Sequence, residues 1–194
     1  MKTSGRQHLF LTGGIQTGKS TLLSRWLSRI DCRIGGFYTR KVPENEHVYV
    51  RIFPAYPYAK PVDDNRLFDT LHKDALDSDK QFNTVGCSML EDSRGAELIV
   101  MDEIGYKEDT ASAFCEAVLR TLDGTVPVIG VLRKRTPDRT TEALSGALTE
   151  IIRSRSDVTV LEVTEANRDE LALSLPDILL PFSDQVADDG TCHS

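Results

Sequence analysis

The segment "GGIQTGKST", residues 13–21, constrains the fold more than any other stretch of the chain. It matches the pattern GxxxxGK[ST], and it lies between an apolar run at residues 8–12 and a sequence with helical periodicity. The glycines let the backbone turn tightly and point several N–H groups at one anion, and the helix that follows adds its positive dipole end. This segment therefore predicts a strand, a phosphate-binding loop and a helix in succession.

Strand and helix patterns alternate in much of the remaining chain, which predicts an α/β fold with a doubly wound, mostly parallel sheet. Nearly continuous apolar runs indicate strands that are buried on both faces, whereas apolar residues spaced by three or four positions indicate helices. The expected strands are residues 8–12, 97–102, 126–132 and 158–163, and the expected helices contain the apolar residues of 22–30, 111–122 and 144–152.

The middle of the chain has a different pattern. Residues 37–42 and 47–53 are rich in β-branched and aromatic side chains and flank a turn-like segment, so they predict an antiparallel hairpin. Residues 82–90 are a third strand candidate of the same kind. We interpret residues 54–80, which contain three prolines, as a loop with one short helix around Leu67, Leu71 and Leu76.

Length and composition fit one compact domain. The chain has 194 residues, of which 40% are hydrophobic and 27% charged, enough for a sizeable single core. We place this domain at residues 1–182 and expect the polar, acidic residues 183–194 to form a flexible tail. The chain has neither an apolar signal segment near its start nor the roughly 20 apolar residues that cross a bilayer, so we expect a cytosolic protein without a membrane partner.

The net charge limits the class of ligand. A formal charge of -7 argues against nucleic acid as the main partner, because binding a phosphate backbone needs a positive surface. Any phosphate site must therefore be local, and the glycine-rich loop is its candidate. The sequence does not identify a protein partner, although the acidic tail and the hairpin could serve as docking surfaces for one.

The loop predicts a nucleoside triphosphate, ATP or GTP, as ligand. Lys19 supplies a movable charge for the β- and γ-phosphates, the Ser20 hydroxyl can bind Mg²⁺, and Thr21 would lie near the α-phosphate. The expected nucleotide-binding residues are Gly13, Gly14, Ile15, Gln16, Thr17, Gly18, Lys19, Ser20 and Thr21.

Two carboxylates follow the apolar strand predicted at residues 97–102. Asp102 would lie at the carboxyl edge of the sheet, beside the loop after the first strand, where it can be the second protein ligand of Mg²⁺ together with Ser20. Glu103 would then project toward the γ-phosphate, where it can orient and deprotonate an attacking water. Simple solvation of a strand end is the alternative for both side chains.

A basic cluster, "RKRTPDR" at residues 133–139, follows the apolar strand predicted at residues 126–132. One of its cations can stabilise the charge that develops on the γ-phosphoryl group, as an arginine finger supplied in cis. Arg133 is the first candidate, with Lys134 and Arg135 beside it. A solvated surface loop is an equally open interpretation.

Several stretches together resemble a known family. "GGIQTGKSTLL", "GGFYTRKV", "LIVMDEIG", "VPVIGVLRKR" and "VTEANRDEL" occur in the order and approximate spacing found in the small P-loop nucleoside-triphosphatases of thermophilic prokaryotes and in the human cancer-related nucleoside-triphosphatase. The resemblance extends from Leu9 to about Leu180, and "GFYT" and "DEIG" are its most diagnostic parts. It implies a RecA-like three-layer fold whose mostly parallel sheet is extended by antiparallel strands, and Mg²⁺-dependent hydrolysis of nucleoside triphosphates with broad base preference.

The same resemblance assigns further roles. It implies Lys19 and Glu103 as catalytic residues, and it makes Asn167 and Arg168 of "NRD" candidates for contact with the base or ribose. A helix-capping asparagine beside an exposed arginine is the alternative for this pair. The chain departs from the family pattern "DEIGKME" because Tyr106 follows the glycine and Lys107 comes one position later, which leaves the catalytic rate and nucleotide preference open.

Two other classes of function share the glycine-rich loop. A small-molecule or nucleotide kinase would need an acceptor site and a lid with arginines, and residues 54–80 contain only Arg66. A nucleotide-binding accessory protein would use slow hydrolysis as a timer for assembly with a partner. The guanine-recognition sequence NKxD is absent from the chain, so dedicated GTP recognition of the GTPase-switch type is not supported.

Overall fold

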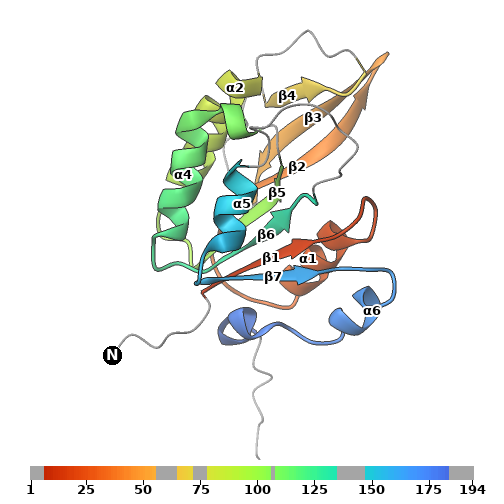
Figure 1. The fold of residues 1–194 in the computed structure, drawn as a ribbon, viewed down its shortest axis with the longest axis vertical. Helices are drawn as coiled ribbons and strands as arrows, with labels where there is room; N and C mark the ends of the chain where they lie inside the picture. Colours follow the sequence, from red (N-terminus) through yellow and green to blue (C-terminus); the bar gives the residue numbers. More distant parts are fainter. Residues whose placement is uncertain (1–6, 56–64, 72–77, 106–107, 135–146, 184–194) are drawn as a thin grey trace, which may run out of the picture.

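The computed structural model describes residues 7–55, 65–71, 78–105, 108–134 and 147–183. Across them runs a seven-stranded sheet in the order β4-β3-β2-β5-β6-β1-β7 (Figure 1). The strands from β2 to β7 in this order are parallel to their neighbours, and β3 and β4 add an antiparallel extension. Their bounds are β1 His8–Thr12, β2 Ile34–Glu44, β3 His47–Pro54, β4 Arg66–Asp69, β5 Leu98–Ile104, β6 Val128–Leu132 and β7 Val158–Glu162.

Helices cover both faces of the sheet (Figure 1). A larger core lies between the sheet and α3, α4 and α5, with Phe37, Phe82 and Phe114 at its centre, and a smaller core lies under α1, around Trp26. The predicted three-layer α/β fold is thus confirmed. The helices are α1 Lys19–Leu27, α2 Ser78–Gln81, α3 Cys87–Glu91, α4 Ser112–Leu122, α5 Ala147–Ser154 and α6 Arg168–Leu171, with a π-helical segment η1 Phe82–Gly86 and 3-10 segments η2 Glu108–Thr110 and η3 Asp177–Phe182.

The predicted hairpin is confirmed, and it is joined directly to the parallel core. Strand β2 pairs antiparallel with β3 on one side and parallel with β5 on the other. Gly36 permits this second pairing, because its φ is +93° and a Cβ built there would lie 2.0 Å from the carbonyl oxygen of Val100, which no larger residue tolerates. The extension therefore begins beside the strand that carries Asp102.

The strand predicted at residues 82–90 is wrong, because this segment is helical and belongs to η1 and α3. Its β-branched and aromatic residues suggested a strand, but its buried residues Phe82, Met89 and Leu90 are spaced by seven and eight positions, which is a helical period. Packing of this face against the ring of Phe114 decides the conformation over local β propensity.

The short helix predicted around Leu67 is also wrong. Leu67 is fully buried on β4, the edge strand of the sheet, while Leu71 is 61% exposed beyond that strand and Leu76 lies outside the described residues. An edge strand of four residues leaves little periodic signal, because only two of its side chains face the core.

The predicted tail, residues 183–194, lies outside the described residues except for Ser183, which forms a β-bridge with Ile30. The domain boundary at residue 182 therefore stays a prediction. Among the helices that the structure describes, none combines the length and the apolar character that crossing a bilayer requires.

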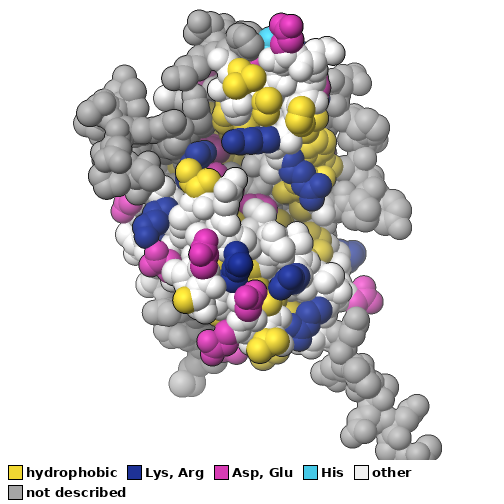
Figure 2. Space-filling model, turned by 90° about the vertical axis from the view of Figure 1, so that its right-hand side faces the viewer, with side chains coloured by type: hydrophobic (Ala, Val, Ile, Leu, Met, Phe, Trp, Pro, Cys, Tyr) yellow, Lys and Arg dark blue, Asp and Glu magenta, His cyan; other side chains and the backbone are white. Residues whose placement is uncertain are grey.

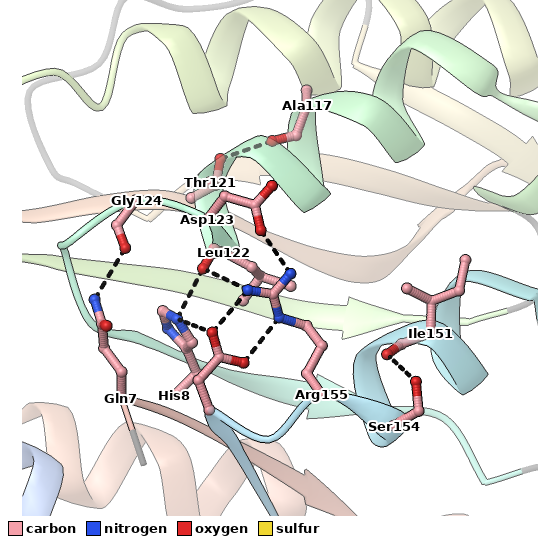
Figure 3. Close-up of polar contacts among 11 residues, drawn as sticks. Gln7, His8, Ala117, Thr121, Leu122, Asp123, Gly124, Ile151, Ser154 and Arg155 are labelled. Atoms are coloured by element: carbon pink, nitrogen blue, oxygen red, sulfur yellow. Dashed lines mark hydrogen bonds and ion pairs between the residues drawn. The ribbon is translucent and has the colours of Figure 1, made fainter. Parts of the chain in front are cut away.

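A polar cluster lies where the parallel strands begin, at the amino edge of the sheet (Figure 3). The His8 ring is 1% exposed. Its Nε2–H donates to the carbonyl of Leu122 at 3.0 Å, and its Nδ1 accepts the N–H of Val128 at 3.1 Å. Arg155 donates to both Asp157 oxygens and to Asp123. These bonds tie β1, α4, β6 and β7 together, and burial lowers the pKa of His8.

Candidate functional site

The glycine-rich loop connects β1 to α1 at the carboxyl edge of the sheet. Gly13 has a φ of +144°, and a Cβ built on it would lie 2.2 Å from the carbonyl oxygen of Val163, so glycine is required there. Gln16 and Gly18 have φ values of 63° and 92°. Such left-handed residues are costly except in glycine and are typical of functional turns. The backbone is thus wrapped into the tight loop that a phosphate-binding nest needs.

Lys19 is folded back over this loop. Its Nζ donates to the carbonyl oxygens of Gly13 at 3.2 Å and of Gly14 at 2.6 Å, and the residue is only 9% exposed. Burial lowers the pKa of Lys19, against the opposing effect of Glu103 and Asp102. The ammonium group is therefore held above the loop by two neutral acceptors, which negatively charged oxygens of a ligand can replace.

Ser20 and Asp102 meet across 82 positions of sequence. The Ser20 hydroxyl at the start of α1 donates to Asp102 Oδ1, on β5, at 3.1 Å. Burial raises the pKa of Asp102 to about 6, although the Ser20 hydrogen bond and the charges of Lys19 and Arg40 act in the opposite direction. The site thus contains a carboxylate whose negative charge is only partly compensated by the residues around it.

Glu103 and Arg133 lie next to this pair. Arg133 follows β6, and its Nη1 lies 3.6 Å from Glu103 Oε1. Lys134, in contrast, forms an ion pair with Glu162 at 2.6 Å, and Arg135 lies outside the described residues. Of the basic cluster, the structure therefore brings Arg133 to the two carboxylates.

A cleft of about 180 Å³ opens beside these residues. It is bordered by the end of β5, by the start of α1 and by the part of β2 that continues past the end of β5. Figure 2 looks onto this edge of the sheet, and Lys and Arg side chains gather across the middle of the face, below a group of hydrophobic side chains. The lining residues include Ser20, Arg40, Lys41, Asp102, Glu103, Glu108 and Arg133.

Three charged residues of this cleft were missed by the sequence reasoning. Arg40 and Lys41 lie on β2, and the sequence analysis gave them no role in a site. Glu108 is 6% exposed, and its Oε2 accepts the N–H of Gly105 at 3.0 Å, which links η2 to the end of β5. Arg40 and Lys41 belong to the segment "GGFYTRKV" of the resemblance, but it is the pairing of β2 with β5 that brings the two basic residues here.

The "NRD" pair divides into two different environments. Asn167 Oδ1 accepts the N–H of Thr164, and its Nδ2 donates to the carbonyl of Glu162, so the amide holds its own loop. Arg168 lines a second cleft beside the glycine-rich loop, together with Gln16, Gly18, Thr21, Leu22 and Arg25. Arg168 thus remains near a bound nucleotide's expected position, while the Asn167 side chain is engaged in local structure.

The remaining departures from the family pattern, Tyr106 and Lys107, lie outside the described residues. Their effect on rate and nucleotide preference stays open.

Ser20 and Asp102 are the residues suited to a metal ion. Both present oxygen ligands, which Mg²⁺ prefers, and Mg²⁺ commonly takes only one or two protein ligands because substrate phosphates and water complete its shell. Among the described residues, no group of three or more His, Cys, Asp or Glu side chains could hold a metal ion.

This loop, these carboxylates and this sheet define the class of P-loop NTPases. A family model described as NTPase matches residues 8–52 and 70–175, more than half of the chain. The chain therefore belongs to the NTPase family, a family of enzymes, as the resemblance implied.

Similarity to individual proteins agrees with this membership. The nucleoside-triphosphatase THEP1 of Thermotoga petrophila is 29% identical over 178 residues, covering 84% of this chain and 87% of the relative. The THEP1 of Natranaerobius thermophilus is 26% identical over 174 residues, covering 84% and 91%.

Two solved structures share the fold. The crystal structure of THEP1 from Aquifex aeolicus has a TM-score of 0.65 at 24% identity and covers 89% of this chain and 99% of its own. The solution structure of a human cancer-related nucleoside triphosphatase has a TM-score of 0.57 at 26% identity, with 86% and 94% covered. These neighbours confirm the predicted RecA-like P-loop architecture with its antiparallel extension.

Proposed function

We propose that this protein hydrolyses the γ-phosphate of ATP, GTP and related nucleoside triphosphates in a Mg²⁺-dependent reaction with broad base preference. One observation carries the proposal. The Ser20 hydroxyl and the Asp102 carboxylate, from distant segments, lie 3.1 Å apart beside the only lysine of the glycine-rich loop. A polyphosphate on the loop would thus reach a carboxylate pair at its γ end.

The donor set at Ser20 and Asp102 fits Mg²⁺. The hydroxyl and the carboxylate are hard oxygen ligands, and the raised pKa of Asp102, caused mainly by burial, marks a place where a cation would relieve an unfavourable negative charge. When bound, the ion would neutralise charge on the β- and γ-phosphate oxygens.

The residues of the chain account for the chemical step. Lys19 would exchange the carbonyls of Gly13 and Gly14 for β- and γ-phosphate oxygens. Glu103 would accept a proton from water while the water oxygen attacks the γ-phosphorus and the bond from this phosphorus to the bridging β–γ oxygen breaks. The products are the nucleoside diphosphate and inorganic phosphate. Arg133, 3.6 Å from Glu103, can stabilise the developing charge.

The second cleft supports broad base preference. Reading a particular base requires side-chain donors and acceptors in a defined pattern, and the Asn167 amide is already engaged by Thr164 and Glu162. The guanidinium groups of Arg25 and Arg168, which line this cleft, can stack on the face of any base.

The test is phosphate release from ATP, GTP, CTP and UTP, with Mg²⁺ or with EDTA, by the wild type and by Glu103→Gln. We expect release from all four nucleotides, dependent on Mg²⁺ and lowered about 1000-fold in Glu103→Gln. Glu165→Gln, which changes an exposed glutamate at the same edge of the sheet, should keep the wild-type rate. Binding without release would favour the accessory role, and transfer to an added acceptor would favour a kinase.

A further inference from the structure

Arg40 occupies a position that follows from strand register. In the parallel pairing of β2 with β5, Tyr38 lies opposite Asp102. Residues two apart on a strand face the same side of a sheet. Arg40 therefore shares the face of Tyr38 and Asp102, and it lies two positions further along β2 than the residue opposite Asp102. That face is the one on which Asp102 meets Ser20. Because β5 ends at Ile104, this register puts Arg40 level with the last residue of β5, at the carboxyl edge of the parallel core.

The guanidinium group of Arg40 lies over one aromatic ring, that of Tyr38. Its Cζ lies 4.8 Å from the centroid of the Tyr38 ring, and this ring stacks on Phe53 of β3, with centroids 5.2 Å apart and planes 17° apart. An arginine stacked on an aromatic ring loses less conformational freedom when it binds an anion. The antiparallel extension thus presents a guanidinium group in a restricted position.

Arg40 and the proposed magnesium and water-activating residues border one cleft, together with Arg133. Arg133 reaches the cleft from β6, beside Glu103, whereas Arg40 reaches it from β2, on the other side of β5. Strand β5, which carries Asp102, lies between these two strands. A γ-phosphoryl group at Asp102 and Glu103 would therefore have a guanidinium group on each side, and planar guanidinium groups match the three equatorial oxygens of a transferring phosphoryl group.

We propose that Arg40 is a catalytic residue that contacts the γ-phosphoryl group in the transition state, and that Tyr38 and Phe53 position it. The antiparallel extension then supplies a part of the active site in addition to its structural role. This inference rests on the proposed triphosphate hydrolysis.

The variants Arg40→Ala, Arg40→Lys and Tyr38→Leu test the proposal against Arg66→Ala. Arg66 is a matched control, because its guanidinium lies over the Tyr49 ring at 5.3 Å in the same extension, yet it is not among the described residues that line the cleft. The measurements are kcat and KM for ATP, and calorimetric affinity for Mg-ADP with and without vanadate, which mimics the transferring phosphoryl group.

Arg40→Ala is expected to lower kcat about 100-fold and to lower the affinity for Mg-ADP with vanadate by a similar factor. Its affinity for Mg-ADP alone should stay within twofold, because ADP lacks the γ-phosphate. Arg40→Lys should recover part of the loss, since it keeps the charge but not the fork of donors. Tyr38→Leu should lower kcat less than Arg40→Ala and leave KM near its wild-type value, and Arg66→Ala should match the wild type.

The proposal is overturned if wild-type enzyme hydrolyses ATP and Arg40→Ala keeps both kcat and vanadate-complex affinity within threefold. It is also overturned if Arg66→Ala loses as much as Arg40→Ala, since a general loss of positive charge would then explain both. A wild type that releases no phosphate from any triphosphate instead refutes the proposed function. Because Arg40 is exposed, melting temperatures within about 3 °C of wild type are expected, and Arg40→Lys serves as the test if Arg40→Ala does not fold.

Discussion

The two edges of the parallel sheet differ in how completely their buried polar groups are paired. At the amino edge, both ring nitrogens of His8 are hydrogen-bonded, and Arg155 is paired with two aspartates. At the carboxyl edge, Lys19 is bound only to neutral carbonyls and burial raises the pKa of Asp102 to about 6. Satisfied polar groups stabilise a fold, whereas incompletely compensated ones are typical of a site that awaits a ligand.

The comparison therefore separates stability from function. Both edges contain buried ionisable groups, so burial alone does not distinguish a site from a structural cluster. The difference lies in the hydrogen-bond and charge partners of these groups, which are complete at the amino edge and incomplete at the carboxyl edge. Variants at the amino edge should cost stability and leave the chemistry intact, while variants at the carboxyl edge should cost binding or catalysis and leave stability unchanged or higher.

The largest expected effect is at the carboxyl edge. Lys19→Ala should weaken binding of a non-hydrolysable ATP analogue about 100-fold, because it removes the charged donor to the phosphates. Its melting temperature should not fall, since the hydrogen bonds that the Lys19 ammonium forms with the described residues go to carbonyls of its own loop. Calorimetry and thermal melting measure the two effects. Lys134→Ala is the control, because that lysine pairs with Glu162 at the same edge and should leave affinity within twofold; an unfolded Lys19→Ala would contradict the assignment of the loop.

At the amino edge, His8→Ala should lower the free energy of unfolding by about 2 to 4 kcal/mol, since it leaves a cavity and takes away the acceptor of the Val128 N–H. The Leu122 carbonyl keeps its hydrogen bond from Arg155. The kcat of the folded variant should equal that of the wild type. Urea unfolding gives the stability, and phosphate release at a temperature where both proteins are folded gives kcat. Gln7→Ala removes a hydrogen bond to the carbonyl of Gly124 at the same edge and should cost under about 0.5 kcal/mol. If His8→Ala and Gln7→Ala lost the same free energy of unfolding, His8 would contribute no more to stability than a partly exposed residue of the same edge.

The smallest expected effect is a gain in stability. The pKa of Asp102 is raised to about 6 from an ordinary value of 3.8, so the folded state binds more protons than the unfolded state between these values. Asp102 therefore makes the nucleotide-free protein less stable as pH rises from about 4 to 6. Asp102→Asn lacks this titration, and at pH 7 it should be more stable than the wild type by about 1 to 2 kcal/mol while losing Mg²⁺-dependent hydrolysis.

Urea unfolding at several pH values checks this prediction. The stability difference between Asp102→Asn and the wild type should grow from pH 4 to 6 and level off above that range. Asp169→Asn, at a carboxylate whose side chain is 81% exposed, is the control for an Asp-to-Asn change at the surface. A destabilised Asp102→Asn at pH 7 would mean that the carboxylate supports the fold and that the two edges do not differ in this respect.

The pH dependence of stability that His8 contributes has the opposite sign, because burial lowers the pKa of His8. Its contribution to stability is full above about pH 6.5 and declines as pH falls below that value.

Much of the parallel core was readable from the chain. The glycine-rich loop with its lysine and serine, the buried strands that flank it, and the hairpin all have local signals in periodicity or in glycine spacing. Asp102 and Glu103 could be placed because an apolar strand must end at the sheet's carboxyl edge. The helical conformation of residues 82–90 and the edge strand β4 could not be predicted from the sequence, since short elements take their conformation from the neighbours they pack against.

By itself, then, the amino-acid sequence determined that a glycine-rich loop between a strand and a helix and a carboxylate-ended strand exist, because their signals are contained in short contiguous stretches. The tertiary structure alone decided that Arg133 rather than Lys134 lies beside Glu103, that the Asn167 amide is engaged by its own loop, and that Arg40 and Asp102 line the same cleft. The physical reason is register: which strands pair, and at which residues, is set by long-range packing of the sheet, and a side chain's surroundings follow from that pairing.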